Sequence, residues 1–354
     1  MSRPARAASV RVRLSRPRRR PEVSLPPGCD PASILLTFPV APEHAGQRLD
    51  RFIQHRIPRL SRTRAQEVVK SCAYRADGTR RRASERVRAG ETVILVRPAF
   101  EEPNVPLYFD VLHEDDAILG LDKPAGLPVH PSASYHKHTL TYLLRQRYGK
   151  DPPQIAHRLD RETSGLILCG RTHASERALK IDFENRRVSK RYLAIVRGEM
   201  PDDSGRISFP MDRAKEGLHI LMEVTPEGEG YPSVTRYRVL ARRDGATLVA
   251  LAPESGRQHQ LRVHLAALGH PIIGDKLYGP DGVQAFLDYI ETGLTDSLRD
   301  RLGHDRQALH AYELHFTHPH TGEPTTLRAP LADDLVALWR EPLSEATFAS
   351  VGAC

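Results

Sequence analysis

The stretch HRLDRETSGLILCG, His157–Gly170, places one carboxylate, that of Asp160, between the guanidinium groups of Arg158 and Arg161. If the segment is locally extended, the side chains of Arg158 and Asp160 share one face and that of Arg161 points away. A neighbouring cation favours the ionised form of a carboxyl group and lowers its pKa. An ionised aspartate can act as a nucleophile, and the same pattern also fits a structural salt bridge in a loop.

Two segments that follow this stretch in the chain show the two-residue period of β-strands. In SKRYLAIVRG (189–198), Tyr192, Ala194 and Val196 fall on one face. The segment SVTRYRVLARRDGATLVALAPESG (233–256) predicts two strands joined by a turn at Asp244-Gly245. Such strands, with helices inserted between them, predict an α+β domain with a mixed, mainly antiparallel sheet.

A helix is predicted in HQLRVHLAALGHPIIGDKLYG (259–279), where Leu261, Leu265 and Leu268 have helical spacing before Gly269. Arg262 lies on a neighbouring stripe of that helix and is therefore a candidate functional residue. The histidines of the segment do not have the spacing of an H-E-x-x-H zinc site, so we expect no metal.

The N-terminal part of the chain predicts a small α/β module over residues 46–98. Leu49, Phe52 and Ile53 have helical spacing, and Ser61 can cap a second helix. A turn at Asp77-Gly78 and a strand TVILV (92–96) follow. The second helix carries basic side chains that we expect to face a polyanion: Arg62, Arg64 and Lys70.

The remaining segments predict flexible connections around two domains. Residues 1–45 begin with an arginine-rich stretch that has no acid before Glu22, which favours a disordered basic tail; a targeting segment or a misplaced start stays open. The proline-rich residues 99–110 predict a linker, and residues 111–345 a catalytic domain.

Composition limits the partners and the environment. The 354 residues carry a formal net charge of +8, which favours a nucleic-acid partner. No apolar run is long enough to span a membrane, and the four cysteines form no C-x-x-C pair, so we expect a soluble, reduced, cytoplasmic protein. A P-loop and a dinucleotide fingerprint are absent, and we expect no cofactor.

Several motifs, in one order along the chain, together resemble the RluA-type RNA pseudouridine synthases. They are LDKPAGLPVHP (121–131), HRLDRETSGLIL (157–168), KRYLAIVRG (190–198), SGRQHQLRVHLAALGHPIIGDKLYG (255–279) and LHAYELHFTHPHTGEP (309–324). Residues 46–98 resemble the S4 RNA-binding domain, which precedes the catalytic domain in many members. The resemblance implies the pseudouridine synthase type of α+β fold.

The resemblance also implies a role for each matching residue. Asp160 would be the catalytic aspartate, Arg262 the arginine that pairs with it, and Tyr192 the tyrosine that stacks on the target uracil. Arg158 would fill the space left by the flipped nucleotide. Two positions depart from the family pattern, because Gln258 stands where Thr or Ser is usual and Glu254 where Val or Ile is commoner.

The implied reaction converts uridine in RNA to pseudouridine, with large-subunit ribosomal RNA as the expected substrate and transfer RNA as an alternative. Asp160 would either attack C1′ or remove a ribose proton, and the sequence leaves both open. A non-catalytic RNA-binding scaffold is a second hypothesis. A nucleoside or glycoside hydrolase is a third, which the lack of a paired acid in these motifs disfavours.

Overall fold

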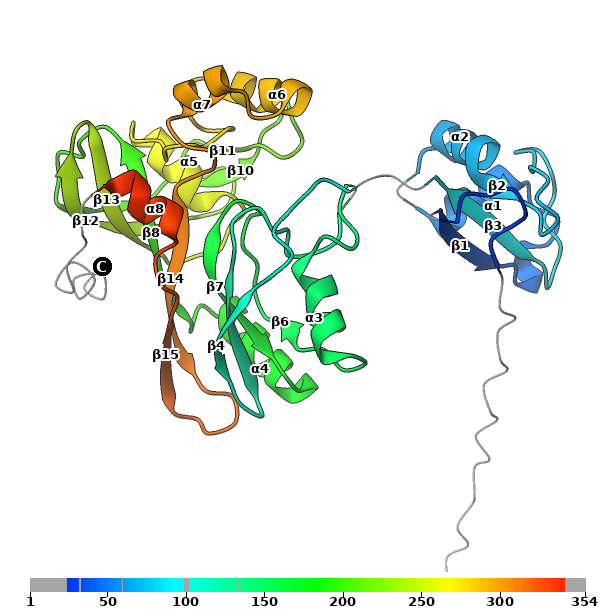
Figure 1. Ribbon diagram of the computed structural model, residues 1–354, viewed down its shortest axis with the longest axis horizontal. Coiled ribbons are helices and arrows are strands. Elements are labelled where there is room, and N and C mark those ends of the chain that lie inside the picture. The colour runs from blue at the N-terminus through cyan, green and yellow to red at the C-terminus, as the bar shows by residue number, and fades with distance from the viewer. Residues whose placement is uncertain (1–23, 32, 59, 99–101, 133, 341–354) are drawn as a thin grey trace, which may run out of the picture. The chain divides into compact units, whose positions relative to one another are not determined.

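The computed structural model describes residues 24–340 except 32, 59, 99–101 and 133, so most of the expected N-terminal tail, the start of the expected linker and residues 341–345 lie outside the described residues. The chain divides after Glu101 into two compact units, which are drawn from blue to red in Figure 1.

The first unit is a three-stranded antiparallel sheet packed against two helices (Figure 1). Its sheet has the order β1-β3-β2, and its core joins apolar side chains of both helices to those of the central strand. The hydroxyl of Ser61 accepts a hydrogen bond from the Arg64 backbone N–H, so it caps the second helix as predicted. The elements are β1 (Ile34–Pro39), the 3-10 helix η1 (Pro42–His44), α1 (Leu49–Arg56), α2 (Arg62–Cys72), β2 (Ala73–Tyr74) and β3 (Thr92–Arg97).

The prediction of a disordered tail through residue 45 is wrong at its C-terminal end. Residues 34–39, ILLTFP, pair along their whole length with β3, from Ile34 opposite Arg97 to Pro39 opposite Thr92. The apolar character of this short segment is explained by the sheet edge that it covers, a long-range partner that local composition does not reveal.

The second unit is built on a ten-stranded sheet whose main path runs β4-β5-β7-β14-β8-β13-β12-β9. Among the described strands, β14 pairs with β7 in parallel and the other paired strands run antiparallel, which confirms the predicted mixed sheet. The strands of this sheet are β4 (Asp110–Glu114), β5 (Ile118–Lys123), β6 (Gln154–Ile155), β7 (Ser164–Gly170), β8 (Ser189–Arg197), β9 (Ser204–Ile207), β12 (Thr235–Arg243), β13 (Ala246–Pro253), β14 (Leu309–Thr317) and β15 (Pro324–Arg328).

Helices and one small hairpin surround this sheet (Figure 1). Apolar side chains of α5 pack with those of the central strands β8 and β13, and α4 packs beside β7. The hairpin consists of β10 (Met211–Arg213) and β11 (Met222–Val224), and the helices are α3 (Leu140–Tyr148), α4 (His173–Glu184), α5 (Gln260–Ala267), α6 (Val283–Thr292), α7 (Asp296–Leu302) and α8 (Asp333–Trp339).

The expected linker over residues 99–110 is also too long, because its described part belongs to the second unit. The carboxylate of Glu102 accepts hydrogen bonds from the backbone N–H groups of His136, Lys137 and His138 at 2.8–3.0 Å. Val105 and Phe109 pack against the apolar cluster that lies beneath β5 and β7.

Within the described part of the chain, no helix is long and apolar enough to cross a membrane.

Candidate active site

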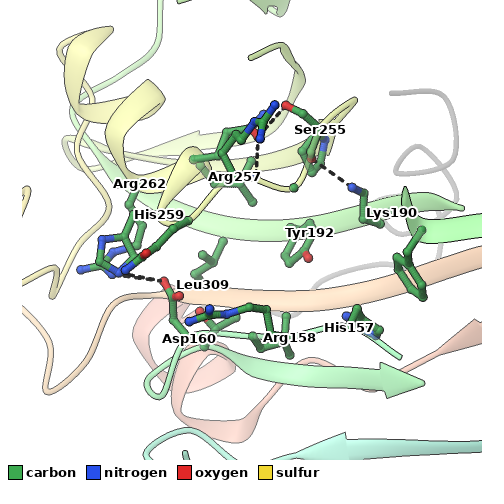
Figure 2. Close-up of a pocket in the computed structure, with 18 of the residues that line it drawn as sticks. His157, Arg158, Asp160, Lys190, Tyr192, Ser255, Arg257, His259, Arg262 and Leu309 are labelled. Carbon is green, nitrogen blue, oxygen red and sulfur yellow. Dashed lines mark hydrogen bonds and ion pairs between the residues drawn. The ribbon is translucent and has the colours of Figure 1, made fainter. Parts of the chain in front are cut away.

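A pocket of about 530 Å³ in the second unit collects the residues that the sequence singled out in this part of the chain. Asp160 and Arg158 reach it from the loop between β6 and β7, Tyr192 from β8, and Arg262 from α5 (Figure 2). The pocket therefore joins three segments that are far apart in the sequence.

The loop that carries Asp160 is held at both ends. At its start, the imidazole of His157 stacks on Phe183 with ring centroids 4.5 Å apart and accepts a hydrogen bond from the backbone of β7. At its end, the carbonyl of Arg161 accepts hydrogen bonds from the backbone of Gly126 and from the ammonium of Lys123, at 2.8 and 3.0 Å. The carboxylate is thus presented on a fixed backbone.

Arg262 links two carboxylates with different atoms of its guanidinium group. Its Nη1 donates to Asp160 Oδ2 at 3.1 Å, while Nε and Nη2 donate to the two oxygens of Asp275 at 2.6 and 2.8 Å. Asp275 is fully buried, and it also accepts the backbone N–H groups of Leu277 and Tyr278. Asp275 therefore fixes Arg262, whereas Asp160 keeps an open side toward the pocket.

These charges keep Asp160 ionised. Burial alone would raise the pKa of its carboxyl group, but the positive charge of Arg262 and its hydrogen bond, with a smaller contribution from Arg158, hold that pKa below its usual range. The carboxylate is therefore available as a nucleophile or a base at neutral pH.

Tyr192 forms one wall of the pocket, and its pKa is perturbed in the opposite direction. Burial, followed by the negative charge of Asp160, raises the pKa of the phenol above its usual value. The hydroxyl is therefore protonated at neutral pH, and the flat ring is available for stacking on a base.

His259, at the N-terminus of α5, was missed as part of the site. His259 lies in the left-handed region, with φ of 56°, and its Nε2 is 3.9 Å from Asp160 Oδ2. Its Nδ1 is hydrogen-bonded to the Tyr278 hydroxyl at 2.8 Å. Burial, then the charge of Arg262, lowers the pKa of His259 to about 4, so the imidazole is neutral at pH 7. The backbone strain at this position is the kind that is found at functional sites.

The three basic residues predicted on the first unit lie elsewhere, on α2. Arg62, Arg64 and Lys70 are all exposed, and Arg64 forms an ion pair with Glu67 at 2.7 Å. The same unit has a basic hollow that the sequence did not reveal, lined by a different set of arginines: Arg75, Arg80, Arg82, Arg86 and Arg88.

His264, on α5, lies in the core and not in the pocket. His264 is buried and is hydrogen-bonded to the Thr235 hydroxyl and the Phe209 carbonyl, which agrees with a packing role. In the part of the chain that the structure describes, no group of three or more histidine, cysteine, aspartate or glutamate side chains could hold a metal ion.

Comparison with known proteins identifies the class of enzyme. A family model described as RNA pseudouridylate synthase matches residues 117–267. The chain belongs to this family, in its RluA-type branch, and it is an RNA pseudouridine synthase. The motifs quoted from the sequence therefore identified the enzyme class correctly.

Individual relatives cover most of the chain. It is 38% identical over 323 residues to the ribosomal large subunit pseudouridine synthase D of Xanthomonas campestris, covering 87% of this chain and 93% of the relative. The enzyme of the same name from Haemophilus influenzae is 35% identical, covering 86% and 94%. The solved structure of human RNA pseudouridylate synthase domain containing 1 is 27% identical with a TM-score of 0.55, covering 72% of this chain and 98% of that one.

Proposed function

We propose that this enzyme isomerises uridine to pseudouridine in large-subunit ribosomal RNA, that Asp160 acts on the ribose, and that no cofactor takes part. The name shared by the bacterial relatives supports this RNA class. The observation that carries the catalytic assignment is the ionised carboxylate of Asp160, held by Arg262 at 3.1 Å in the wall of the pocket.

The reaction needs no redox change and no external group. The bond between N1 and C1′ breaks, the uracil turns, C5 bonds to C1′, the C5 proton leaves, and N1 gains a proton. Asp160 begins this sequence either by attacking C1′ or by removing a ribose proton, and both routes use an ionised carboxylate. Arg262 keeps that carboxylate charged and oriented.

The uridine must leave its stack before its glycosidic carbon can be reached. The ring of Tyr192 offers a surface for the extruded uracil, and the exposed guanidinium of Arg158 at the pocket can contact the strand that has lost its base. We further propose that residues 46–98 act as an S4-like module that contacts RNA phosphates through Arg62, Arg64 and Lys70. We propose the cytoplasm as the compartment, because Cys29, Cys72 and Cys169 are free thiols.

Pseudouridine mapping tests the function directly. Total RNA would be mapped from a deletion strain, and from the same strain carrying the wild-type gene, Asp160→Asn or the exposed-site control Asp151→Asn. We expect the same large-subunit uridines to lose modification in the deletion and in Asp160→Asn, and to regain it with the wild type and the control. If the sites that lose pseudouridine lie in transfer RNA, then transfer RNA is the substrate in place of ribosomal RNA. If Asp160→Asn keeps the modification, the hypothesis of a non-catalytic RNA-binding scaffold is favoured.

A further inference from the structure

The end of the pocket away from Asp160 is basic and takes no part in the reaction proposed above. Lys190 lies two residues before Tyr192 on β8, so the two side chains share one face of the strand, about 7 Å apart along it. Figure 2 shows Tyr192 between Asp160 and Lys190. Arg186 lines the same pocket and lies in the left-handed region, with φ of 59°.

Lys190 is a largely enclosed cation without an acidic partner. Its Nζ donates to the Ser255 carbonyl at 3.0 Å. The backbone of Gly256 also lies close, because a methyl group placed on Gly256 would be 3.7 Å from Nζ of Lys190. An ammonium group has three N–H donors, so one backbone carbonyl satisfies only part of its capacity. Over the described residues, no carboxylate lies within 4.0 Å of the charged nitrogens of Lys190 or Arg186; Glu184, which also lines the pocket, is exposed.

The surroundings oppose the charge of Lys190. Burial, followed by the positive charge of Arg186, lowers the pKa of Lys190 to about 8. A buried charge is ordinarily compensated by an opposite one, because desolvation without a partner is unfavourable. Two neighbouring cations in a pocket wall therefore define a place where an anion would be stabilised.

We propose that Lys190, with Arg186 beside it, binds a phosphodiester of the target RNA strand while the extruded uridine lies against Tyr192. This proposal rests on the proposed function, since it takes the pocket to hold a nucleotide of RNA. The order of groups along the pocket matches a nucleotide: the carboxylate at the sugar, the ring at the base, and the cations at a phosphate. Lys190 thereby fixes the position of the strand relative to Asp160.

Three substitutions separate this role from a structural one. Lys190→Arg keeps the charge, Lys190→Gln keeps a donor for the Ser255 carbonyl without the charge, and Lys190→Met removes both. Affinity would be measured in the Asp160→Asn background, so that RNA is bound and not converted. The probe is a stem-loop containing the uridine that mapping identifies, and the control is Lys150→Met, an exposed lysine that does not line the pocket.

We expect Lys190→Gln and Lys190→Met to lower affinity about tenfold, as for the loss of a charge-assisted hydrogen bond, with Lys190→Arg near wild type. The slope of log affinity against log salt should fall by about 0.7 in the Gln and Met variants and stay unchanged in the Lys150→Met control. If Lys190→Gln binds with wild-type affinity and salt slope, Lys190 serves only the loop at Ser255 and the proposal is wrong.

Uncharged methylphosphonate linkages in the RNA identify the phosphate that Lys190 contacts. Stem-loops with a single methylphosphonate at the linkage before the uridine, at the linkage after it, or far from it would be compared in wild-type and Lys190→Gln backgrounds. We expect one linkage next to the uridine whose neutralisation weakens the wild type about tenfold and the variant hardly at all. Equal losses in both backgrounds at every linkage would refute the contact. A mapped uridine outside large-subunit RNA would overturn only the substrate assignment, since the same experiment runs on that RNA.

Discussion

Replacing Asp275 by asparagine tests whether this buried carboxylate positions Arg262 for Asp160. Asparagine has nearly the same shape, and its carbonyl oxygen can still accept the backbone N–H groups of Leu277 and Tyr278. Its amide N–H₂ group would face the Nε–H of Arg262, where the wild-type Asp275 oxygen accepts at 2.6 Å. A charge-assisted hydrogen bond is thereby replaced by two opposed donors.

The magnitude follows from the burial of the pair. Removing one partner of a buried ion pair destabilises a protein by about 3–5 kcal/mol, and Asp275 has only 1% of its surface exposed. The new amide could still accept from Nη2 of Arg262, but Asp160 would be the one anionic partner left to Arg262 among the described residues, so the carboxylate and the guanidinium can move together. A displacement of a reacting group by about 1 Å lowers a rate about a hundredfold. The pKa of Asp160 should stay low, because it no longer shares the charge of Arg262.

Two assays check these expectations for Asp275→Asn. Chemical denaturation measures the free energy of unfolding, and single-turnover conversion of saturating RNA measures the chemical step without the binding term. The control is Asp288→Asn, whose carboxylate pairs with Arg301 on the surface, and it should match the wild type in both assays. A wild-type rate in Asp275→Asn, together with a loss of stability below about 1 kcal/mol, would refute the positioning role.

Three further outcomes are expected. Tyr192→Phe keeps the ring and should bind RNA normally while conversion slows about a hundredfold if the hydroxyl takes part in proton transfer; unchanged turnover would restrict Tyr192 to stacking. Burial lowers the pKa of His310 to about 4, whereas the same imidazole takes up a proton near pH 6.5 in the unfolded chain. The free energy of unfolding should therefore fall by about 2 kcal/mol between pH 7 and pH 5 through this group. Chemical denaturation of His310→Asn at both pH values should show a fall that is smaller by this amount. Gly165→Ala would place a methyl group 2.2 Å from the Ala311 carbonyl oxygen and should lower stability by about 3 kcal/mol. The loss should be smaller for Gly245→Ala, which has φ of 73° and open space.

Much of the architecture could be predicted because it depends on near neighbours. The alternation in residues 189–198 gave strand β8, and the turn at Asp244-Gly245 joins β12 and β13 with both residues at positive φ. The Ser61 cap was equally local. The boundaries of the two units were less predictable, since β1 depends on pairing with β3 and Glu102 on backbone groups 34 residues away.

The site divides in the same way. The resemblance of the motifs to RluA-type synthases singled out Asp160, Tyr192 and Arg262, and the structure brings all three to one pocket. It gave no sign of Asp275, which follows Arg262 by 13 residues, or of Lys190, which precedes Tyr192 in a motif already quoted. The signal for Asp275 was present as the one acidic residue in the glycine-containing segment PIIGDKLYG (271–279).

By itself, the amino-acid sequence determined strands β3, β8, β12 and β13, helices α1, α2 and α5, the basic character of the chain and the family motif around Asp160. These features depend on periodicity and on residue types close together in the chain. Only the tertiary structure decided which charges are compensated. Arg262 is shared between Asp160 and Asp275, whereas Lys190 is enclosed beside Arg186 with no acidic group among the described residues to pair with it. Burial and long-range proximity determine the energy of a charge, and both arise only when distant segments fold together.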